Sequence, residues 1–89
     1  MITEQIIVVN KLGLHARAAS KLVKLTAGFA CSIKLICRQQ EVDAKSIMGI
    51  LMLAATQGTE LTLTTDGVDE AMASKAVIDL FLDYFGEDE

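Results

Sequence analysis

The chain contains a single histidine, and its position suggests phosphoryl chemistry. His15 follows a glycine-containing loop and comes directly before residues 16–27, which have a helical pattern. The first backbone N–H groups of a helix have no partner within it, and the helix dipole adds partial positive charge there. A phosphate at this point would meet donors that exist before it arrives. We therefore expect the backbone N–H groups of Ala16, Arg17 and Ala18 to bind a phosphate.

Imidazole and guanidinium together suit the transfer of a phosphoryl group. An unperturbed imidazole has a pKa of about 6.5, so a neutral ring nitrogen is available as a nucleophile near neutral pH. The guanidinium of Arg17 could contact the same phosphate oxygens. Phosphoryl transfer depends mainly on alignment and charge stabilisation, so we expect no metal and no cofactor. The alternative is that His15 is an ordinary cap or surface group.

The hydrophobic pattern predicts four strands. Residues 3–9 form a β-branched run, residues 31–37 alternate between apolar and polar, residues 41–43 follow a turn at Gln39 and Gln40, and Leu61 begins a last strand that ends at residues 66–67.

Three helices are predicted between and after these strands. The first covers residues 16–27, the second begins after Ser46 as N-cap and is broken at residues 57–58, and the third opens with Asp69 and Glu70. The buried stripe expected on the third helix comprises Ala73, Ala76, Val77, Leu80, Phe81 and Tyr84. Residues 86–89 are expected to fray. The fold class is therefore α+β, an open-faced sandwich of order βαββαβα with a mainly antiparallel sheet and three helices on one face.

Composition limits the class of protein. The 89 residues, 52% of them hydrophobic, predict a single domain over residues 1–89. No apolar run approaches the roughly 20 residues that span a bilayer, and the N-terminus lacks a basic signal region, so we expect a cytoplasmic protein without membrane insertion. Cys31 and Cys37 lie about 20 Å apart along one strand, too far for a disulfide, and a zinc site lacks ligands.

Charge is distributed unevenly along the chain. Residues 1–48 carry seven basic and three acidic side chains, whereas residues 49–89 carry one basic and nine acidic ones. A basic face suits acidic protein partners. Nucleic acid is not expected, because the basic half has one aromatic residue and no dense Lys/Arg run.

Residues 10–20 (NKLGLHARAAS) closely resemble the active-site segment of the HPr family, the phosphocarriers of the bacterial phosphoenolpyruvate-dependent phosphotransferase system. The similarity continues through residues 44–67 (AKSIMGILMLAATQGTELTLTTDG) and into the last helix. It implies that His15 accepts a phosphoryl group on Nδ1 from enzyme I and passes it to enzyme IIA-type proteins, with Arg17 stabilising the group. Such a protein is a monomeric carrier and not a stand-alone enzyme. The family commonly has Pro where this chain has Ala18, which is a good helix former, so we expect the helix to persist.

The same resemblance assigns a regulatory role to Ser46. The segment AKSIMGI is similar to the serine segment that an ATP-dependent HPr kinase/phosphorylase modifies, although a capping role alone also explains Ser46. The resemblance also predicts a partner interface on the first two helices, formed by Arg17, Lys21, Lys24, Ile47, Met48 and Leu51. For Lys21 and Lys24 an ordinary solvated helix face is the alternative.

Two other functions fit parts of the sequence. The nitrogen-branch relatives called NPr also have the NKLG-HAR pattern and an acidic C-terminus, and they relay phosphate to regulatory proteins instead of sugar permeases. A signalling module that reports phosphorylation through Ser46 would not need a working His15.

Overall fold

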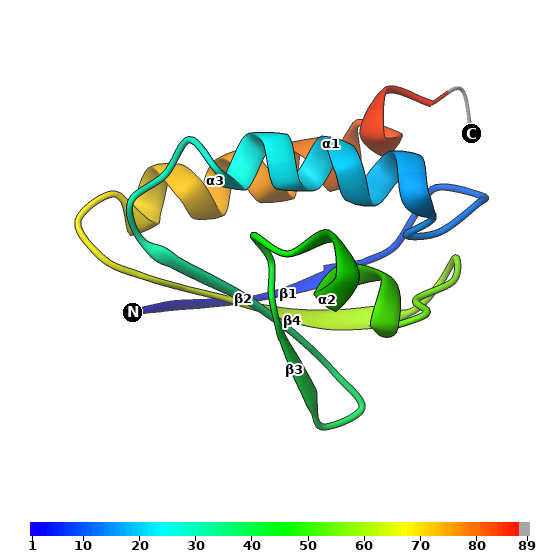
Figure 1. The fold of residues 1–89 in the computed structure, drawn as a ribbon, viewed down its shortest axis with the longest axis horizontal. Coiled ribbons are helices and arrows are strands. Elements are labelled where there is room, and N and C mark those ends of the chain that lie inside the picture. The colour runs from blue at the N-terminus through cyan, green and yellow to red at the C-terminus, as the bar shows by residue number, and fades with distance from the viewer. Residues whose placement is uncertain (88–89) are drawn as a thin grey trace.

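The computed structural model describes residues 1–87. Its elements are β1 (Ile2–Ile7), α1 (Ala16–Thr26), β2 (Ser32–Cys37), β3 (Gln40–Asp43), α2 (Ile47–Met52), β4 (Glu60–Asp66), α3 (Glu70–Leu82) and a 3-10 turn, η1 (Tyr84–Gly86). The strands form one sheet of order β1-β4-β2-β3, in which every neighbouring pair is antiparallel. The three helices cover one face of this sheet (Figure 1). The predicted fold class is confirmed.

The core lies between the sheet and the helices. In β2 and β4, alternate residues point into it, and Ile33, Leu35, Leu61 and Leu63 are fully buried. Helix α1 contributes Ala18, Ala19, Leu22 and Thr26 in a helical repeat. Within residues 1–87, no helix combines the length and apolarity needed to cross a bilayer.

The predicted boundaries shift where the backbone turns. The β2–β3 hairpin turns at Arg38 and Gln39, which both have positive φ, so Gln40 belongs to β3 and not to the turn. This pair matches a two-residue hairpin turn, whose two central residues are left-handed. Helix α2 ends at Met52, well before Gln57, because Ala54 adopts a left-handed conformation that terminates it.

The C-terminal part of the third helix differs from prediction. Ala73, Val77 and Phe81 are buried as expected, whereas Ala76 and Leu80 are only half-buried. The helix ends at Leu82, and Tyr84 is 40% exposed. Phe85 fills the core instead, with its ring centroid 4.8 Å from that of Phe81. The backbone has positive φ at Tyr84 and Phe85, and this conformation turns the Phe85 ring toward the core.

Asp69 serves a neighbouring loop instead of the start of α3. Its carboxylate accepts the backbone N–H groups of Ala30 (2.8 Å) and Cys31 (2.9 Å), and it makes no capping bond to its own helix. These bonds, first that from Ala30, lower the pKa of the Asp69 carboxyl although desolvation opposes them. The interaction ties the α1–β2 connection to the beginning of α3.

Candidate functional site

The loop before α1 is fixed against the β4 side of the molecule. The Leu14 N–H donates to the Ala55 carbonyl at 2.9 Å, and the Gly13 N–H donates to the Asn10 carbonyl at 3.2 Å. Gly13 has φ +69°, and a Cβ built there would lie 2.5 Å from the Ala55 oxygen. Only glycine fits this close approach. These contacts fix the position of the backbone directly before His15.

His15 is the N-cap of α1. Its backbone is extended, its carbonyl accepts the Ala19 N–H at 2.8 Å, and its Nδ1 accepts the Arg17 N–H at 3.3 Å. The side chain is 27% exposed. Nδ1 therefore faces the first turn of α1, where helix N–H groups are without internal partners.

The other ring nitrogen of His15 contacts a carboxylate from the far end of the chain. Glu87 Oε2 lies 2.5 Å from His15 Nε2, and Glu87 Oε1 accepts Asn10 Nδ2 at 3.0 Å. The Glu87 side chain is only 11% exposed. The prediction that the tail frays from residue 86 is therefore wrong for Gly86 and Glu87, and residues 88–89 lie outside the described part.

Glu87 is the last residue of a short segment, residues 83–87, which we call the C-terminal strap. The preceding residues of the strap hold it in this place. Phe85 anchors the strap in the core, and Lys21 Nζ donates to its carbonyl at 2.5 Å. Gly86 follows with φ +76°. In the sequence, the only signal for this arrangement is an aromatic residue followed by glycine and an acid.

The environment of Glu87 keeps its carboxylate ionised. Burial opposes ionisation, but hydrogen bonds from Asn10 and His15, together with electrostatic attraction to His15 and Lys21, outweigh burial and lower the pKa of Glu87. A carboxylate rather than a carboxylic acid therefore faces the imidazole at neutral pH.

Of the phosphate-binding residues predicted from the sequence, Arg17 contacts Nδ1 through its backbone N–H, and Ala16 and Ala18 lie beside it in the first turn of α1. Arg17 is exposed, and no hydrogen bond or ion pair joins its guanidinium to another side chain within residues 1–87. Ala16 is exposed beside it, whereas the Ala18 side chain is fully buried in the core. The alanine at position 18 thus packs well in place of the usual proline. The roles of Ala16, Arg17 and Ala18 as phosphate ligands stay predictions.

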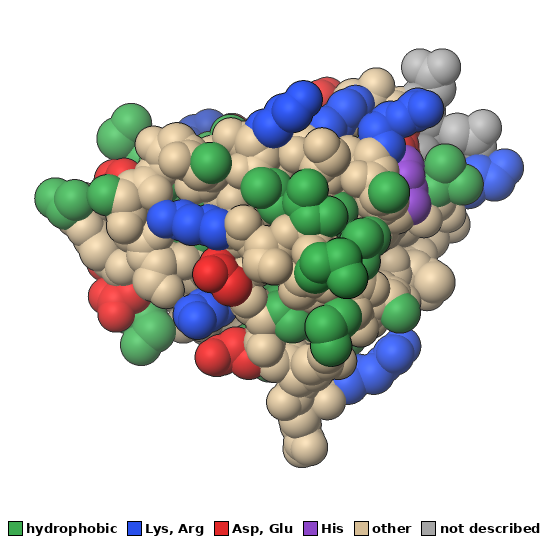
Figure 2. Space-filling view, in the orientation of Figure 1, with side chains coloured by type: hydrophobic (Ala, Val, Ile, Leu, Met, Phe, Trp, Pro, Cys, Tyr) green, Lys and Arg blue, Asp and Glu red, His purple; other side chains and the backbone are tan. Residues whose placement is uncertain are grey.

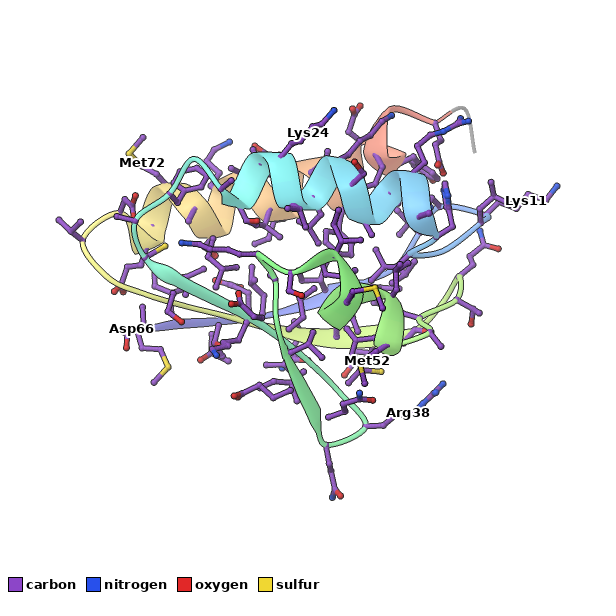
Figure 3. All side chains as sticks on the ribbon, in the orientation of Figure 1. Lys11, Lys24, Arg38, Met52, Asp66 and Met72 are labelled. Carbon is purple, nitrogen blue, oxygen red and sulfur yellow. The ribbon has the colours of Figure 1, made fainter. Side chains whose placement is uncertain are left out.

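The predicted interface residues fall into two groups. Lys24, Ile47 and Met48 are exposed, with Lys24 pointing away from α1 (Figure 3). Lys21 and Leu51 are half-buried: Lys21 is engaged with the strap, and Leu51 packs on the core. Lys21 is therefore not simply a solvated residue of the helix face, because its ammonium donates to the protein's own backbone; its part in an interface stays a prediction.

Two further apolar residues are exposed: the surplus of apolar residues in residues 47–52 indicated Met52, whereas sequence reasoning missed Leu12. Leu12 is 67% and Met52 is 64% exposed. The space-filling view shows hydrophobic side chains gathered beside the histidine, below a row of Lys and Arg side chains (Figure 2). The available signal for Leu12 was its place in a loop directly before Gly13.

Ser46 is confirmed as the N-cap of α2. Its Oγ accepts the Gly49 N–H at 3.1 Å, and the residue is half-buried. Ser46 directly precedes Ile47, which is exposed. No group of three or more His, Cys, Asp or Glu side chains within residues 1–87 could hold a metal ion.

Comparisons with known proteins agree with this architecture. A family model described as the PTS HPr component phosphorylation site matches residues 2–83. Phosphocarrier protein HPr of Cupriavidus necator is 47% identical over 89 residues and that of Neisseria meningitidis is 46% identical over 89 residues, each covering 100% of both chains.

Solved structures give the same assignment. HPr-C-His from Thermoanaerobacter tengcongensis is 40% identical, with a TM-score of 0.96 and 100% of both chains covered. Crh, the Bacillus subtilis catabolite repression protein whose structure is described as a swapped dimer, is 35% identical with a TM-score of 0.72, covering 100% of this chain and 98% of that one. An open-faced sandwich with a histidine at the start of its first helix thus places the molecule among the phosphocarriers. The chain belongs to the HPr family of the phosphotransferase system.

Proposed function

We propose that this phosphocarrier accepts its phosphoryl group on His15 Nδ1 from phospho-enzyme I and passes it to enzyme IIA-type proteins in the cytoplasm. The observation that carries the proposal is the placement of Nδ1, which faces the first turn of α1 with a backbone N–H at 3.3 Å. The exposed Arg17 guanidinium lies two residues further along the same turn.

The chemistry requires no base. The Nδ1 lone pair forms a bond to phosphorus, while the bond from phosphorus to the donor breaks and its electron pair leaves with the donor. The proton on Nε2 stays on the ring, which gains positive charge as the new bond forms. The N–H groups of α1 and the Arg17 guanidinium supply charge stabilisation for the transferring oxygens.

The surface around His15 suits acidic partners with an apolar centre. Arg17 and Lys24 supply positive charge, and Leu12, Met48 and Met52 expose apolar surface. Flexible methionines adapt to different partners, as a carrier that contacts both a donor and a receiver requires. We propose a monomer for the working carrier. Because one similar structure is described as an HPr dimer from Thermoanaerobacter tengcongensis, this remains a prediction.

Ser46 phosphorylation by an HPr kinase/phosphorylase would act on docking rather than on folding. A phosphate at the N-cap of α2 is compatible with the helix dipole, so the helix would persist. It would add nearly two negative charges beside Ile47 and Met48 and repel acidic partners. Ser46→Asp should therefore weaken binding to enzyme I, and unchanged affinity would leave Ser46 as a structural cap only.

Phosphorylation with phosphoenolpyruvate and enzyme I tests the main proposal. The full chain should gain one acid-labile, base-stable phosphoryl group, which disappears in His15→Ala and persists in Ser46→Ala. Labelling of His15→Ala would overturn the assignment. Offering the labelled protein to sugar-type and nitrogen-type IIA proteins then decides between sugar uptake and the nitrogen-branch relay.

A further inference from the structure

A series of hydrogen bonds leads from the loop backbone to one edge of the His15 ring. Asn10 is fully buried, and its Nδ2 donates both to the Gly13 carbonyl at 2.8 Å and to Glu87 Oε1 at 3.0 Å. Only the nitrogen of an amide donates, so these two contacts fix which end of the Asn10 amide faces Glu87. Glu87 Oε2 then lies 2.5 Å from His15 Nε2. Since an ionised carboxylate only accepts, Nε2 must carry the ring proton.

The contact at the opposite edge of the ring favours the same tautomer, but it is longer and therefore weaker. The Arg17 backbone N–H donates to His15 Nδ1 at 3.3 Å. A backbone N–H cannot accept, so this contact favours a lone pair on Nδ1. Both contacts therefore leave the nucleophilic lone pair at the first turn of α1, and both place the proton on the side of the strap.

Glu87 is positioned to orient the ring and not to contact a partner. Its side chain is 11% exposed, and the strap that carries it is held by the buried ring of Phe85 and by the bond from Lys21 Nζ to the Phe85 carbonyl. Its carboxylate oxygens both face groups of the same molecule, Asn10 and His15. A docking partner would meet Arg17 and the apolar surface first.

We propose that Glu87 is a positioning residue that selects Nδ1 as the nucleophile of His15 by holding the ring proton on Nε2. This inference rests on the proposed role of His15 as phosphoryl acceptor. During transfer the same carboxylate faces the positive charge that develops on the ring. It therefore also stabilises the phosphorylated carrier relative to the unphosphorylated one. The arrangement resembles in principle a carboxylate that orients a catalytic imidazole in a hydrolase.

The test uses two substitutions of Glu87 that differ in the tautomer they allow. Glu87→Ala removes the acceptor and leaves the ring free to sample both tautomers. In Glu87→Gln, Asn10 Nδ2 claims the new amide oxygen, because the Asn10 orientation is fixed by Gly13. The new NH₂ group then faces His15 Nε2 and moves the ring proton to Nδ1, where it blocks the nucleophile.

We expect the nearly isosteric substitution to be the more damaging one. Maximal phosphorylation by enzyme I should fall about tenfold in Glu87→Ala and about a hundredfold in Glu87→Gln, since a wrong tautomer suppresses an imidazole nucleophile or base by orders of magnitude. The carrier concentration at half-maximal rate should change less than about twofold. Nitrogen-15 spectra of the His15 ring should show the proton on Nε2 in the natural protein and on Nδ1 in Glu87→Gln.

Asp83→Ala is the matched control. Asp83 lies in the same strap, is exposed and makes no capping bond, so its loss removes one negative charge without altering the ring contacts. Its rate and ring spectrum should match those of the natural protein, and urea unfolding verifies that all variants fold. The inference is overturned if Glu87→Gln transfers as fast as Glu87→Ala or retains the proton on Nε2. If His15→Ala is still phosphorylated, the proposed function itself fails, which is a separate result.

Discussion

Replacing Gly13 by alanine perturbs the loop that carries His15 in a way that can be calculated from the structure. The new Cβ would lie 2.5 Å from the Ala55 oxygen and 2.9 Å from the Thr56 Cα, at a residue with φ +69°. These are backbone atoms and cannot rotate away. A left-handed alanine costs about 1–2 kcal/mol, and overpacking against a fixed neighbour adds about 1–3 kcal/mol. We therefore predict that Gly13→Ala lowers the free energy of unfolding by about 2–5 kcal/mol.

Gly58→Ala separates the two contributions. Gly58 also has positive φ, +89°, but no atom lies within 4 Å of a Cβ built there. Gly58→Ala should therefore lower the free energy of unfolding only by the cost of a left-handed alanine, about 1–2 kcal/mol. Urea unfolding followed by circular dichroism measures both values at neutral pH, and the difference between the variants reports the contact with Ala55.

The phosphoryl-transfer rate provides a second comparison for the same pair. The new methyl group of Gly13→Ala must push the loop away from Ala55, which displaces the neighbouring His15. Under conditions in which both variants are folded, transfer should slow in Gly13→Ala and stay unchanged in Gly58→Ala. Equal losses of stability in the two variants, or an undisturbed rate in Gly13→Ala, would refute the reasoning.

Three further predictions concern single side chains. Arg17→Ala should slow phosphoryl transfer by about tenfold to a hundredfold while changing the unfolding free energy by less than about 0.5 kcal/mol; rapid-quench kinetics at full speed would remove its proposed role. Ser46→Ala should cost about 1 kcal/mol in urea unfolding through loss of the bond to Gly49, whereas Ser46→Asp should retain most of that stability because aspartate also caps helices; equal losses would contradict the capping account. The lowered pKa of Asp69 means that its contribution is complete above the ordinary carboxyl pKa of about 4 and is lost as the pH falls through the lower folded value. Asp69→Asn should therefore be less stable than the natural protein at pH 7 and should lose less stability on acidification, and parallel pH profiles from urea unfolding would show that the carboxylate does not stabilise the fold.

The sequence predicted the fold because each element has a clear local pattern. The alternation of Cys31, Ile33, Leu35 and Cys37 has one buried face, as found. Ser46 combines a capping residue with a following apolar repeat, which defines a helix start. These features depend on neighbours only a few positions away, so pattern alone is sufficient.

The remaining part of the site depends on contacts between distant segments. Glu87 and His15 are separated by 72 positions, and the contact requires Phe85 to turn into the core with positive φ. Positive φ is uncommon for an aromatic residue, and no local preference predicts it. The acidic composition of the tail instead favoured fraying. Only tertiary packing makes this carboxylate a neighbour of the imidazole.

The separation of 72 positions between Glu87 and His15 has a consequence for biosynthesis. A ribosome completes α1 and the sheet well before residue 87 is added to the chain. A chain that ends at residue 86 would contain every strand and helix of the fold and still lack the carboxylate that fixes its imidazole. On this account, premature termination just before residue 87 would yield a folded carrier with a poorly oriented nucleophile.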